Sequence, residues 1–452
     1  MNLLPHNARA VREILEAFDN GMQGVLYTSG VGTGKSFVFL GVLAAMREKK
    51  PEAKALYVIP KYAIKENIET YDDFTGQQGN VRFATYNSFK NDEKAMKLLN
   101  DVDLVLIDEC HHVGSDLYGK CLMRCLSKAG TKYLGITATP ERKNGKDSIS
   151  CFFDASVEGI SNFEAIRQNL MPEIIYRVCT PENSINKTQV TLDKAGKRRK
   201  KTRNEVRQRL VYDNADTLLA PVLKKFPRDK WICFFASQKD LYAYKPLVER
   251  MFPAYKVLIL YASLNNLSEV MKEIQENEKV VVLSINILLE GVHLSHIDGI
   301  VLFRNVTSLS AFQQMIGRVC AIGKEIEPVV LDCSSSARKL MAMLLSEDNK
   351  GKGTGGHGGA SSKPVVKIGL GAEEEYDINE LFQFAFEGTD MERNMTAQKI
   401  GSEYMSRGGT KYTTYEDLKK SKDYSKFSAI CWVNGMAPES AYKRMQKMSM
   451  TA

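Results

Sequence analysis

Short apolar runs alternate with amphipathic stretches along most of this chain, and that alternation predicts its architecture. In the first third, several runs have the length and composition of buried strands, and the stretches between them place apolar residues at helical spacing. The predicted strands are Gly24–Thr28, Ala55–Ile59, Val81–Thr85, Leu104–Ile107 and Tyr133–Ile136. The predicted helices cover residues 8–20, 34–48 and about 115–127. Strands alternating with helices predict a parallel sheet with helices on both faces.

A second block with the same alternation starts near residue 210. Its predicted strands are Trp231–Phe235, Lys256–Leu260, Val280–Leu283, Gly299–Phe303 and Pro328–Leu331. Its predicted helices cover residues 214–225, 238–251, 267–276 and 308–319. This block again predicts a parallel sheet, so we expect an α/β fold with two similar lobes.

Three stretches break the alternation and set the expected domain boundaries. Residues 151–210 are polar and connect the lobes, residues 346–363 contain a Gly-rich linker, and residues 364–452 indicate a small helical tail. The lobes are then expected over residues 1–150 and 211–345.

The connecting segment and the tail each leave two or more interpretations open. The segment carries a run of basic side chains at Lys194, Lys197, Arg198, Arg199, Lys200, Lys201 and Arg203. Such a run is typical of a nucleic-acid contact, a localisation signal or a solvated loop. In the tail, the segments that start at Tyr415 and Phe427 are similar to a short helix-turn-helix unit, which either binds DNA or packs as an interaction pair.

Composition says more about the cellular setting of the protein than about the reaction it performs. The net charge of +8, from 62 basic and 54 acidic side chains, favours a polyanionic partner without identifying it. The nine cysteines form no Cys-x-x-Cys pair, which favours reduced, buried thiols over a disulfide framework. The first residues lack a signal-peptide pattern, and no stretch approaches the ~20 apolar residues that span a bilayer. We therefore expect a protein of a reducing cytoplasm, with no membrane partner.

A Gly-rich segment, Ser29–Ser36, follows the strand-like Val25–Thr28 and opens an apolar helix. In this context glycines let backbone N–H groups turn toward an anion, and the helix N-terminus adds favourable partial charge. We expect Lys35 to bind the β and γ phosphates of ATP and Ser36 to supply a hydroxyl to Mg²⁺. The residues expected to bind the nucleotide here are Gly30, Gly32, Thr33, Gly34, Lys35 and Ser36. Ser29 occupies the position at which the complete phosphate-loop motif has a glycine.

An acidic box, Asp108-Glu109-Cys110-His111, follows the apolar strand Leu104–Ile107. Carboxylates at the carboxyl end of a parallel strand lie where open α/β sheets bind ligands. We expect Asp108 to hold Mg²⁺ and Glu109 to polarise the attacking water, because phosphoryl transfer depends mainly on positioning and charge stabilisation.

The loop and the acidic box together resemble superfamily 2 DNA and RNA helicases, and more narrowly the branch with type III restriction motors and DNA translocases. Further segments match the family's motifs in order over roughly residues 1–335. They are Val58–Lys61, Ala84–Tyr86, Gly135–Pro140, Phe234–Ser237, Leu289–Leu294 and Phe312–Arg318.

The resemblance implies two tandem RecA-like lobes of the P-loop NTPase type, with ATP between them. It implies catalytic roles for Gln314 and Arg318, a nucleotide contact at Gly291, and coupling of hydrolysis to strand movement by Thr137 and Thr139. The implied nucleic-acid contacts are Pro60, Lys61, Thr85, Tyr86 and Ser237.

Two positions depart from the family pattern. Asn7 stands where relatives have the glutamine that reads adenine, and Ala321 stands where they have a second arginine. The arginine-finger role is therefore assigned to Arg318.

The leading hypothesis is an ATP-dependent DNA helicase or translocase in phage or bacterial replication, recombination, repair or defence. Replication or repair proteins, or partner subunits, would assemble with it. The alternatives are an RNA helicase and a nucleotide-gated DNA-binding subunit with weak hydrolysis, which Ala321 favours.

Overall fold

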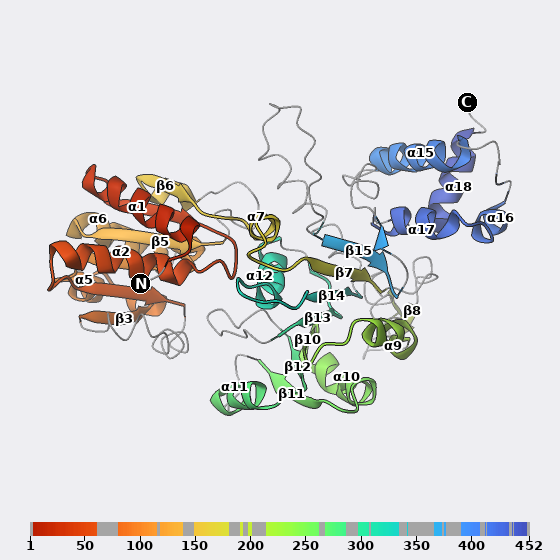
Figure 1. Cartoon of the computed structure of the whole chain (residues 1–452), viewed down its shortest axis with the longest axis horizontal. Coiled ribbons are helices and arrows are strands. Elements are labelled where there is room, and N and C mark those ends of the chain that lie inside the picture. The colour runs from red at the N-terminus through yellow and green to blue at the C-terminus, as the bar shows by residue number, and fades with distance from the viewer. Residues whose placement is uncertain are drawn as a thin grey trace. The chain divides into compact units, whose positions relative to one another are not determined.

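The computed structural model of the chain contains two parallel sheets and a group of C-terminal helices (Figure 1). It describes residues 3–60, 80–114, 118–138, 149–179, 190–192, 198–200, 214–261, 267–285, 297–306, 309–333, 341, 366–372, 375–376, 390–406, 412, 414–433, 436 and 438–449. The chain forms two compact units, and the main boundary between them lies between Met171 and Pro172. The short segment Cys320–Lys324 belongs to the first unit.

The first sheet is entirely parallel, with the strand order β3-β2-β4-β5-β1-β6. Its strands are β1 (Gly24–Thr28), β2 (Ala55–Ile59), β3 (Val81–Thr85), β4 (Leu104–Ile107), β5 (Lys132–Thr137) and β6 (Ala155–Glu158). The parallel register places the carboxyl ends of β1 and β4, which precede the Gly-rich loop and the acidic box, on the same edge of the sheet.

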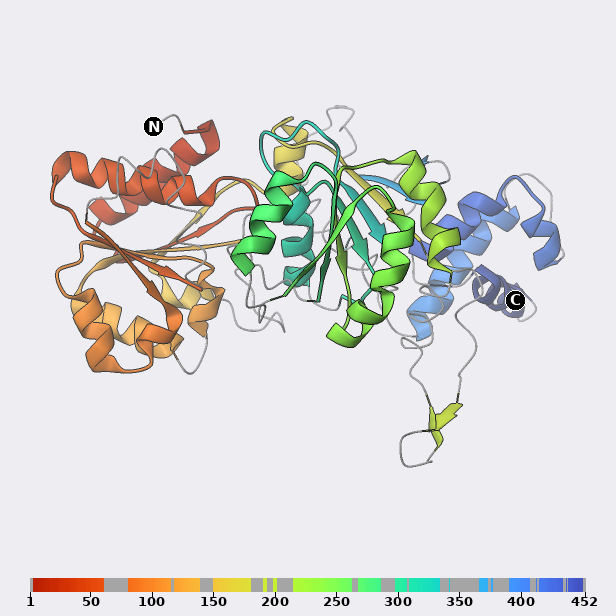
Figure 2. The same cartoon turned by 90° about the horizontal axis from the view of Figure 1, so that it is seen from below.

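Helices cover both faces of this sheet, as Figure 2 shows. On one face, α1 (Pro5–Asp19) and α2 (Lys35–Lys49) bury Ile14, Phe39 and Leu43 against alternate strand residues. On the other face, α5 (Asp92–Leu99) and α6 (Gly119–Ala129) bury Leu99 and Leu122. A sheet with two buried faces needs almost continuously apolar strands, which explains the runs in the sequence.

The second sheet has the order β11-β12-β10-β13-β14-β7-β15-β16 and is parallel except for its last pair. Its strands are β7 (Ile174–Val178), β10 (Lys230–Phe234), β11 (Lys256–Leu260), β12 (Val280–Ser284), β13 (Gly299–Leu302), β14 (Val329–Asp332), β15 (Val366–Leu370) and β16 (Glu375–Tyr376). The helices of this unit before the Gly-rich segment are α9 (Ala215–Lys225), α10 (Gln238–Met251), α11 (Leu267–Glu276) and α12 (Leu309–Val319). Trp231, Phe235 and Leu241 lie in its core.

The α/β class with two tandem parallel-sheet domains is confirmed. Every strand and helix predicted for the two lobes is present, with ends that differ by at most a few residues. The segment expected as a connection, residues 151–210, contributes more than a connection, because β6 joins the first sheet and β7 joins the second. It also contains η3 (Ile149–Phe152) at its start and α7 (Asn162–Arg167).

Part of the basic run lies on a small antiparallel ribbon rather than a loop. Strand β8 (Val190–Leu192) pairs with β9 (Arg198–Lys200), with Thr191 opposite Arg199. Lys194, Lys197, Lys201 and Arg203 lie outside the described residues.

The tail also differs from the expectation of helices alone. After the Gly-rich segment, β15 adds to the second sheet beside β7, where Val366 and Ile368 are buried and Lys367 pairs with Glu173 at 3.1 Å and with Glu327. The expected helices follow as α15 (Asp390–Ser406), α16 (Tyr415–Lys419), α17 (Tyr424–Val433) and α18 (Pro438–Ser449) (Figure 1). Within the described part of the chain, no helix is both long and apolar enough to cross a membrane.

Candidate functional site

The Gly-rich loop joins β1 to the N-terminus of α2, as the sequence predicts. Gly34 is the residue before the helix, and its backbone has φ +87°, while Gly32 has φ +76°. These left-handed conformations are strained for residues with a Cβ, so glycine is required at both positions. A Cβ at Gly34 would lie 2.7 Å from Asn7 Nδ2. The loop is therefore held close to the helix that precedes it.

Helix α1 fixes the loop through its first turn. Asn7 is buried, its Nδ2 donates to Thr33 O at 3.2 Å, and its Oδ1 accepts from the Tyr27 hydroxyl at 3.4 Å. His6 Nε2 also lies 3.1 Å from Thr33 O. Asn7 thus contacts the loop itself, and its adenine-reading role stays a prediction.

Lys35 and Ser36 are the first two residues of α2, and both side chains are half-buried. Lys35 Nζ donates to Gly30 O at 2.7 Å and to Ser29 O at 3.1 Å. An ammonium that is bonded to loop carbonyls can exchange them for phosphate oxygens, because both are hydrogen-bond acceptors. The buried Thr33 hydroxyl donates to Gly30 O at 2.8 Å and closes the loop.

The acidic box begins where β4 ends. Burial first, and the neighbouring charge of Glu109 second, raise the pKa of Asp108 to about 7, and the Lys35 ammonium acts in the opposite direction. Asp108 Oδ1 accepts from the Glu109 amide at 2.9 Å. Lys35 and Asp108 therefore belong to one electrostatic site, although they are 73 positions apart in the chain.

Magnesium is the ion that the family resemblance implies, and the donor set fits it. Mg²⁺ prefers oxygen ligands, and the Ser36 hydroxyl and Asp108 carboxylate supply them at the same edge of the sheet. A bound dication would favour the charged form of Asp108, whose pKa is raised by burial and by the neighbouring carboxylate.

His111 links the acidic box to the end of β5. Its Nδ1 lies 3.3 Å from Glu109 Oε2 and 3.4 Å from the Thr137 hydroxyl. Thr137, one of the two predicted coupling residues, is fully buried beside the box. The second, Thr139, lies outside the described residues.

Tyr86, predicted to contact nucleic acid, is buried against the acidic box. It begins η1 (Tyr86–Phe89), and its hydroxyl donates to Asp108 O at 2.7 Å and to Glu109 O at 3.2 Å. Glu109 has φ +46°, an unfavourable backbone conformation for a residue with a Cβ. The bonds from Tyr86 thus hold the strained turn that carries Glu109. Nothing in the spacing of these residues indicates this contact.

The remaining predicted contacts are distributed over both units. In the first unit Pro60 directly follows strand β2 and Thr85 is the last residue of strand β3, and both are half-buried. In the second unit Ser237 caps α10, because its hydroxyl accepts from the Asp240 amide at 3.1 Å. Lys61 and Gly291 lie outside the described residues.

Helix α12 carries the predicted catalytic pair of the second unit. Gln314 is buried and Arg318 is half-buried near the helix end. The segment after this helix, which belongs to the first unit, lies against the loop: the Ile322 amide donates to Gly32 O at 3.2 Å. A Cβ at Gly32 would lie 2.6 Å from Cys320 O and 3.1 Å from Ala321 Cα.

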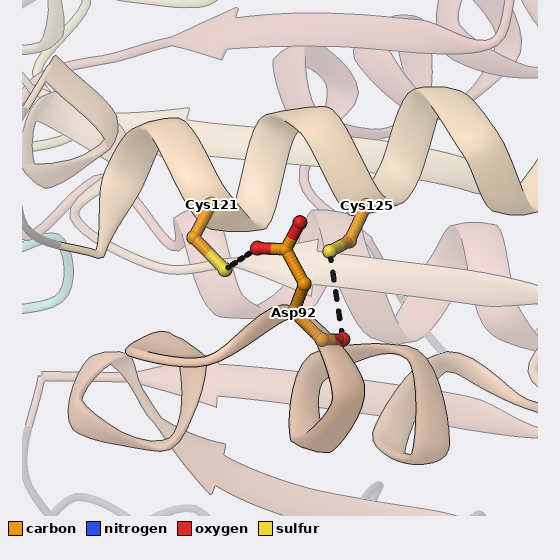
Figure 3. Close-up of side chains that lie close together, drawn as sticks. All are labelled: Asp92, Cys121 and Cys125. Carbon is orange, nitrogen blue, oxygen red and sulfur yellow. Dashed lines mark hydrogen bonds between the residues drawn. The ribbon is translucent and has the colours of Figure 1, made fainter.

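A separate cluster joins α5 to α6 and consists of Asp92, Cys121 and Cys125 (Figure 3). Cys121 Sγ donates to Asp92 Oδ1 at 3.0 Å, and Cys125 Sγ lies 3.9 Å from Asp92 O. Arg124 also binds the Asp92 carboxylate and lowers its pKa to about 2. Since these bonds already pair the polar groups, the cluster packs two helices together, and the expectation that these two thiols are buried is confirmed.

Three family models match consecutive parts of the chain. They are the type III restriction enzyme res subunit over residues 1–81, the SWI2/SNF2 ATPase over residues 61–209, and the helicase conserved C-terminal domain over residues 213–323.

Curated relatives match over shorter stretches. The chain is 23% identical over 169 residues to a type I restriction enzyme EcoAI endonuclease subunit from Escherichia coli, covering 33% of this chain and 21% of that protein. It is 30% identical over 149 residues to the DNA 3'-5' translocase XPB2 of Sulfurisphaera tokodaii, covering 30% of this chain and 31% of that protein. The chain thus spans about a fifth to a third of the length of these relatives.

Solved structures share the fold at low identity. The ATP-dependent Type ISP restriction-modification enzyme LlaBIII bound to DNA has a TM-score of 0.56 at 13% identity, covering 100% of this chain and 42% of that one. The DEAD-box helicase Mss116 bound to ssRNA has a TM-score of 0.53 at 14% identity, covering 98% and 86%. Family models of helicase-type ATPases and of a restriction-enzyme subunit thus match successive parts of residues 1–323. The two tandem sheets share the fold of solved helicase and restriction-enzyme structures, so the chain is similar in both respects to superfamily 2 helicases.

Proposed function

We propose that the chain is an ATP-driven DNA motor that couples hydrolysis to translocation along DNA or to its unwinding. The observation that carries the proposal is that Lys35, after the loop that follows β1, and Asp108 and Glu109, after β4, lie at the same edge of the first sheet. Phosphoryl transfer needs positioning and charge stabilisation, and these side chains are suited to both. Lys35 would bind the β and γ phosphates, and Glu109 would orient the attacking water.

The remaining roles follow from the family. Asp108 and Ser36 would hold Mg²⁺, which neutralises phosphate charge when bound. Gln314, Arg318 and Gly291 would also contact the nucleotide, with Arg318 as the finger that stabilises the γ-phosphate. Asn7 would also contact the base.

The relatives favour DNA as the polymer, and the basic side chains favour a nucleic acid of either kind. The curated relatives are a restriction-endonuclease subunit and a DNA translocase, and one solved relative is bound to DNA. The ribbon strand β9 is Arg-Arg-Lys, a composition suited to phosphate contacts. The net charge is +8. We place the activity in bacterial or phage replication, recombination, repair or defence, in a cytoplasm whose reducing state suits the nine free cysteines. Partner subunits would be expected, as for a motor within a larger assembly.

A nucleotide-gated subunit with weak hydrolysis is the second candidate. One observation favours it: Ala321 lies against Gly32 of the loop, at the position where relatives have a second arginine. A backbone contact there supplies no positive charge to the γ-phosphate.

ATP turnover with different polymers tests these functions. We expect single-stranded, duplex or branched DNA to stimulate the wild type by at least about tenfold, with Lys35→Ala as the inactive control. Stimulation by RNA alone would overturn the choice of DNA. ATP binding without stimulation by any polymer would favour the nucleotide-gated subunit.

A further inference from the structure

A four-residue segment that belongs to none of the predicted motifs is hydrogen-bonded to the phosphate loop. This loop clasp, Gly159–Asn162, follows β6 and opens α7. Its backbone holds the start of the loop: the Gly159 amide donates to Thr28 O at 2.7 Å, and Ile160 O accepts from the Gly30 amide at 2.8 Å. The Ser29 hydroxyl also donates to Ile160 O at 3.0 Å. The residue that departs from the phosphate-loop motif, Ser29, is therefore bonded to the clasp.

Asn162 makes the closest side-chain contacts of the clasp. Its Oδ1 accepts from the Val31 amide at 3.1 Å, and its Nδ2 donates to Val31 O at 2.6 Å. A Cβ at Gly30 would lie 2.7 Å from Asn162 Oδ1 and 2.8 Å from the Asn162 amide nitrogen. One amide side chain thus satisfies both backbone groups of Val31, and the glycine beside it admits that side chain.

The same segment leads directly into the second sheet. Helix α7 ends at Arg167, and β7 starts at Ile174 in that sheet. Asn162 Nδ2 also lies 3.6 Å from Met171 Sδ, close to the point where the chain passes from the first unit to the second. A displacement of Val31 would therefore act on the residues that enter the second unit, because the hydrogen bonds and the covalent chain form one path.

We propose that Asn162 is a positioning residue that transmits nucleotide binding from the phosphate loop to the segment that enters the second sheet. The inference rests on the proposed nucleotide function of the loop. Phosphate oxygens draw loop N–H groups inward, so nucleotide binding competes with Asn162 for the backbone around Val31. The response then passes along α7 to β7. Two sites linked through a shared element must affect each other reciprocally.

Hydrogen exchange of the full chain, with and without the magnesium complex of a non-hydrolysable ATP analogue, tests this path without nucleic acid. In the wild type we expect the nucleotide to slow exchange in residues 29–36 and to change it in residues 162–173. In Asn162→Ala the loop should still respond, whereas the response of residues 162–173 should be lost. Asn162→Asp keeps the side-chain size but places an oxygen against Val31 O, so it should lose the same response.

Ser161→Ala is the matched control. Ser161 caps α7, because its hydroxyl accepts from the Glu164 amide at 3.0 Å. Among the hydrogen bonds of the described residues, none joins the Ser161 side chain to the loop. Its loss should raise exchange in α7 without nucleotide but keep the nucleotide-dependent change. A second measurement compares the DNA Kd with and without nucleotide: the ratio should move toward 1 in the Asn162 variants and stay at the wild-type value in Ser161→Ala.

The outcomes separate this inference from the proposed function. If residues 162–173 of the wild type do not respond while the loop does, the coupling role is wrong and nucleotide binding stands. The same holds if both Asn162 variants keep the response. If the wild-type loop itself does not respond, the proposed function fails and the coupling role fails with it.

Discussion

The two sheets both place an aspartate where a strand ends, but in different environments. Asp108 follows β4 in the first sheet, where Glu109 and burial raise its pKa and Lys35 acts on it. Asp332 ends β14 in the second sheet, is fully buried and accepts from the Tyr176 hydroxyl at 2.5 Å. Ser237, also beyond a strand of the second sheet, caps a helix. The strand ends of the first sheet thus carry charged groups that act on one another, whereas these two side chains of the second sheet are hydrogen-bonded within the fold.

The strongest test of this difference compares carboxylates of the two edges. Glu109→Gln removes the group that would orient the attacking water, and kcat should fall by about 10²–10⁴-fold with nucleotide binding retained. Asp332→Asn should instead lower the free energy of unfolding by about 1–3 kcal/mol and leave kcat within about twofold of the wild type, since it disturbs a buried hydrogen bond. Steady-state ATP turnover and thermal unfolding measure the two effects. Equal losses of kcat would remove the distinction between the edges.

Two truncations compare how the sheets are completed. The first sheet ends with β6, which is close to β5 in the chain, whereas β15 of the second comes from beyond the Gly-rich segment. Deleting residues 364–452 removes buried Val366 and Ile368, each contributing about 1.5–3 kcal/mol. Deleting residues 388–452 keeps β15 and β16. Calorimetry should show a lower Tm for the longer deletion only; matching Tm values would mean that β15 does not stabilise the sheet.

The hydroxyl of Tyr86 provides a test of what holds the acidic residues after β4 in position. Tyr86→Phe removes both hydrogen bonds to the carbonyls of Asp108 and Glu109 while keeping the ring. Because these bonds hold the turn at Glu109, kcat should fall by about tenfold, the equivalent of about 1.4 kcal/mol, with little change in KM for ATP. Phe89→Leu, in the core behind the same turn, is the control and should affect stability more than kcat. A change confined to nucleic-acid affinity would instead support the contact predicted from the sequence.

The smallest effect concerns pH. The raised pKa of Asp108 means that its carboxyl stays protonated to higher pH than an ordinary aspartate, and the proton competes with Mg²⁺. Below about pH 7, the Mg²⁺ concentration for half-maximal turnover should rise by up to about tenfold per pH unit. Turnover measured against Mg²⁺ at several pH values checks this. A Mg²⁺ requirement that is constant from pH 8 to pH 6 would contradict it.

Local patterns predicted most of the fold because the buried strands are short and continuously apolar. The predicted bounds of β1, β2, β3 and β4 agree with the structure. Strand β15 was not predicted, since five residues after a Gly-rich stretch carry no sign of a partner strand at Ile174–Val178. Strand β7 has an apolar pattern of its own, but it lies inside residues 151–210, which the sequence predicts as a polar connection between the lobes.

The candidate site was likewise predictable from local patterns only in part. The sequence predicts Lys35, Asp108 and Glu109 as site residues, because the loop before Lys35 and the two carboxylates follow apolar strands and these side chains have a recognisable chemistry. The nucleic-acid contact of Tyr86 stays a prediction, and the sequence does not indicate the hydrogen bond of its hydroxyl to the acidic box. It did not identify Asn162, whose amide contacts a loop 131 positions earlier in the chain.

The sequence by itself determined the two α/β lobes, the phosphate loop and the acidic box, because strand periodicity and motif spacing depend on neighbours in the chain. Only the tertiary structure decided which polar side chains face a ligand and which are bonded within the fold. Asp108 and Asp332 both follow apolar strand residues, but the groups that act on their carboxylates differ. The charges of Glu109 and Lys35 act on Asp108, whereas Asp332 accepts a hydrogen bond from the Tyr176 hydroxyl. Hydrogen-bond partners and burial are set by strand order and packing, which bring together residues that are distant in sequence.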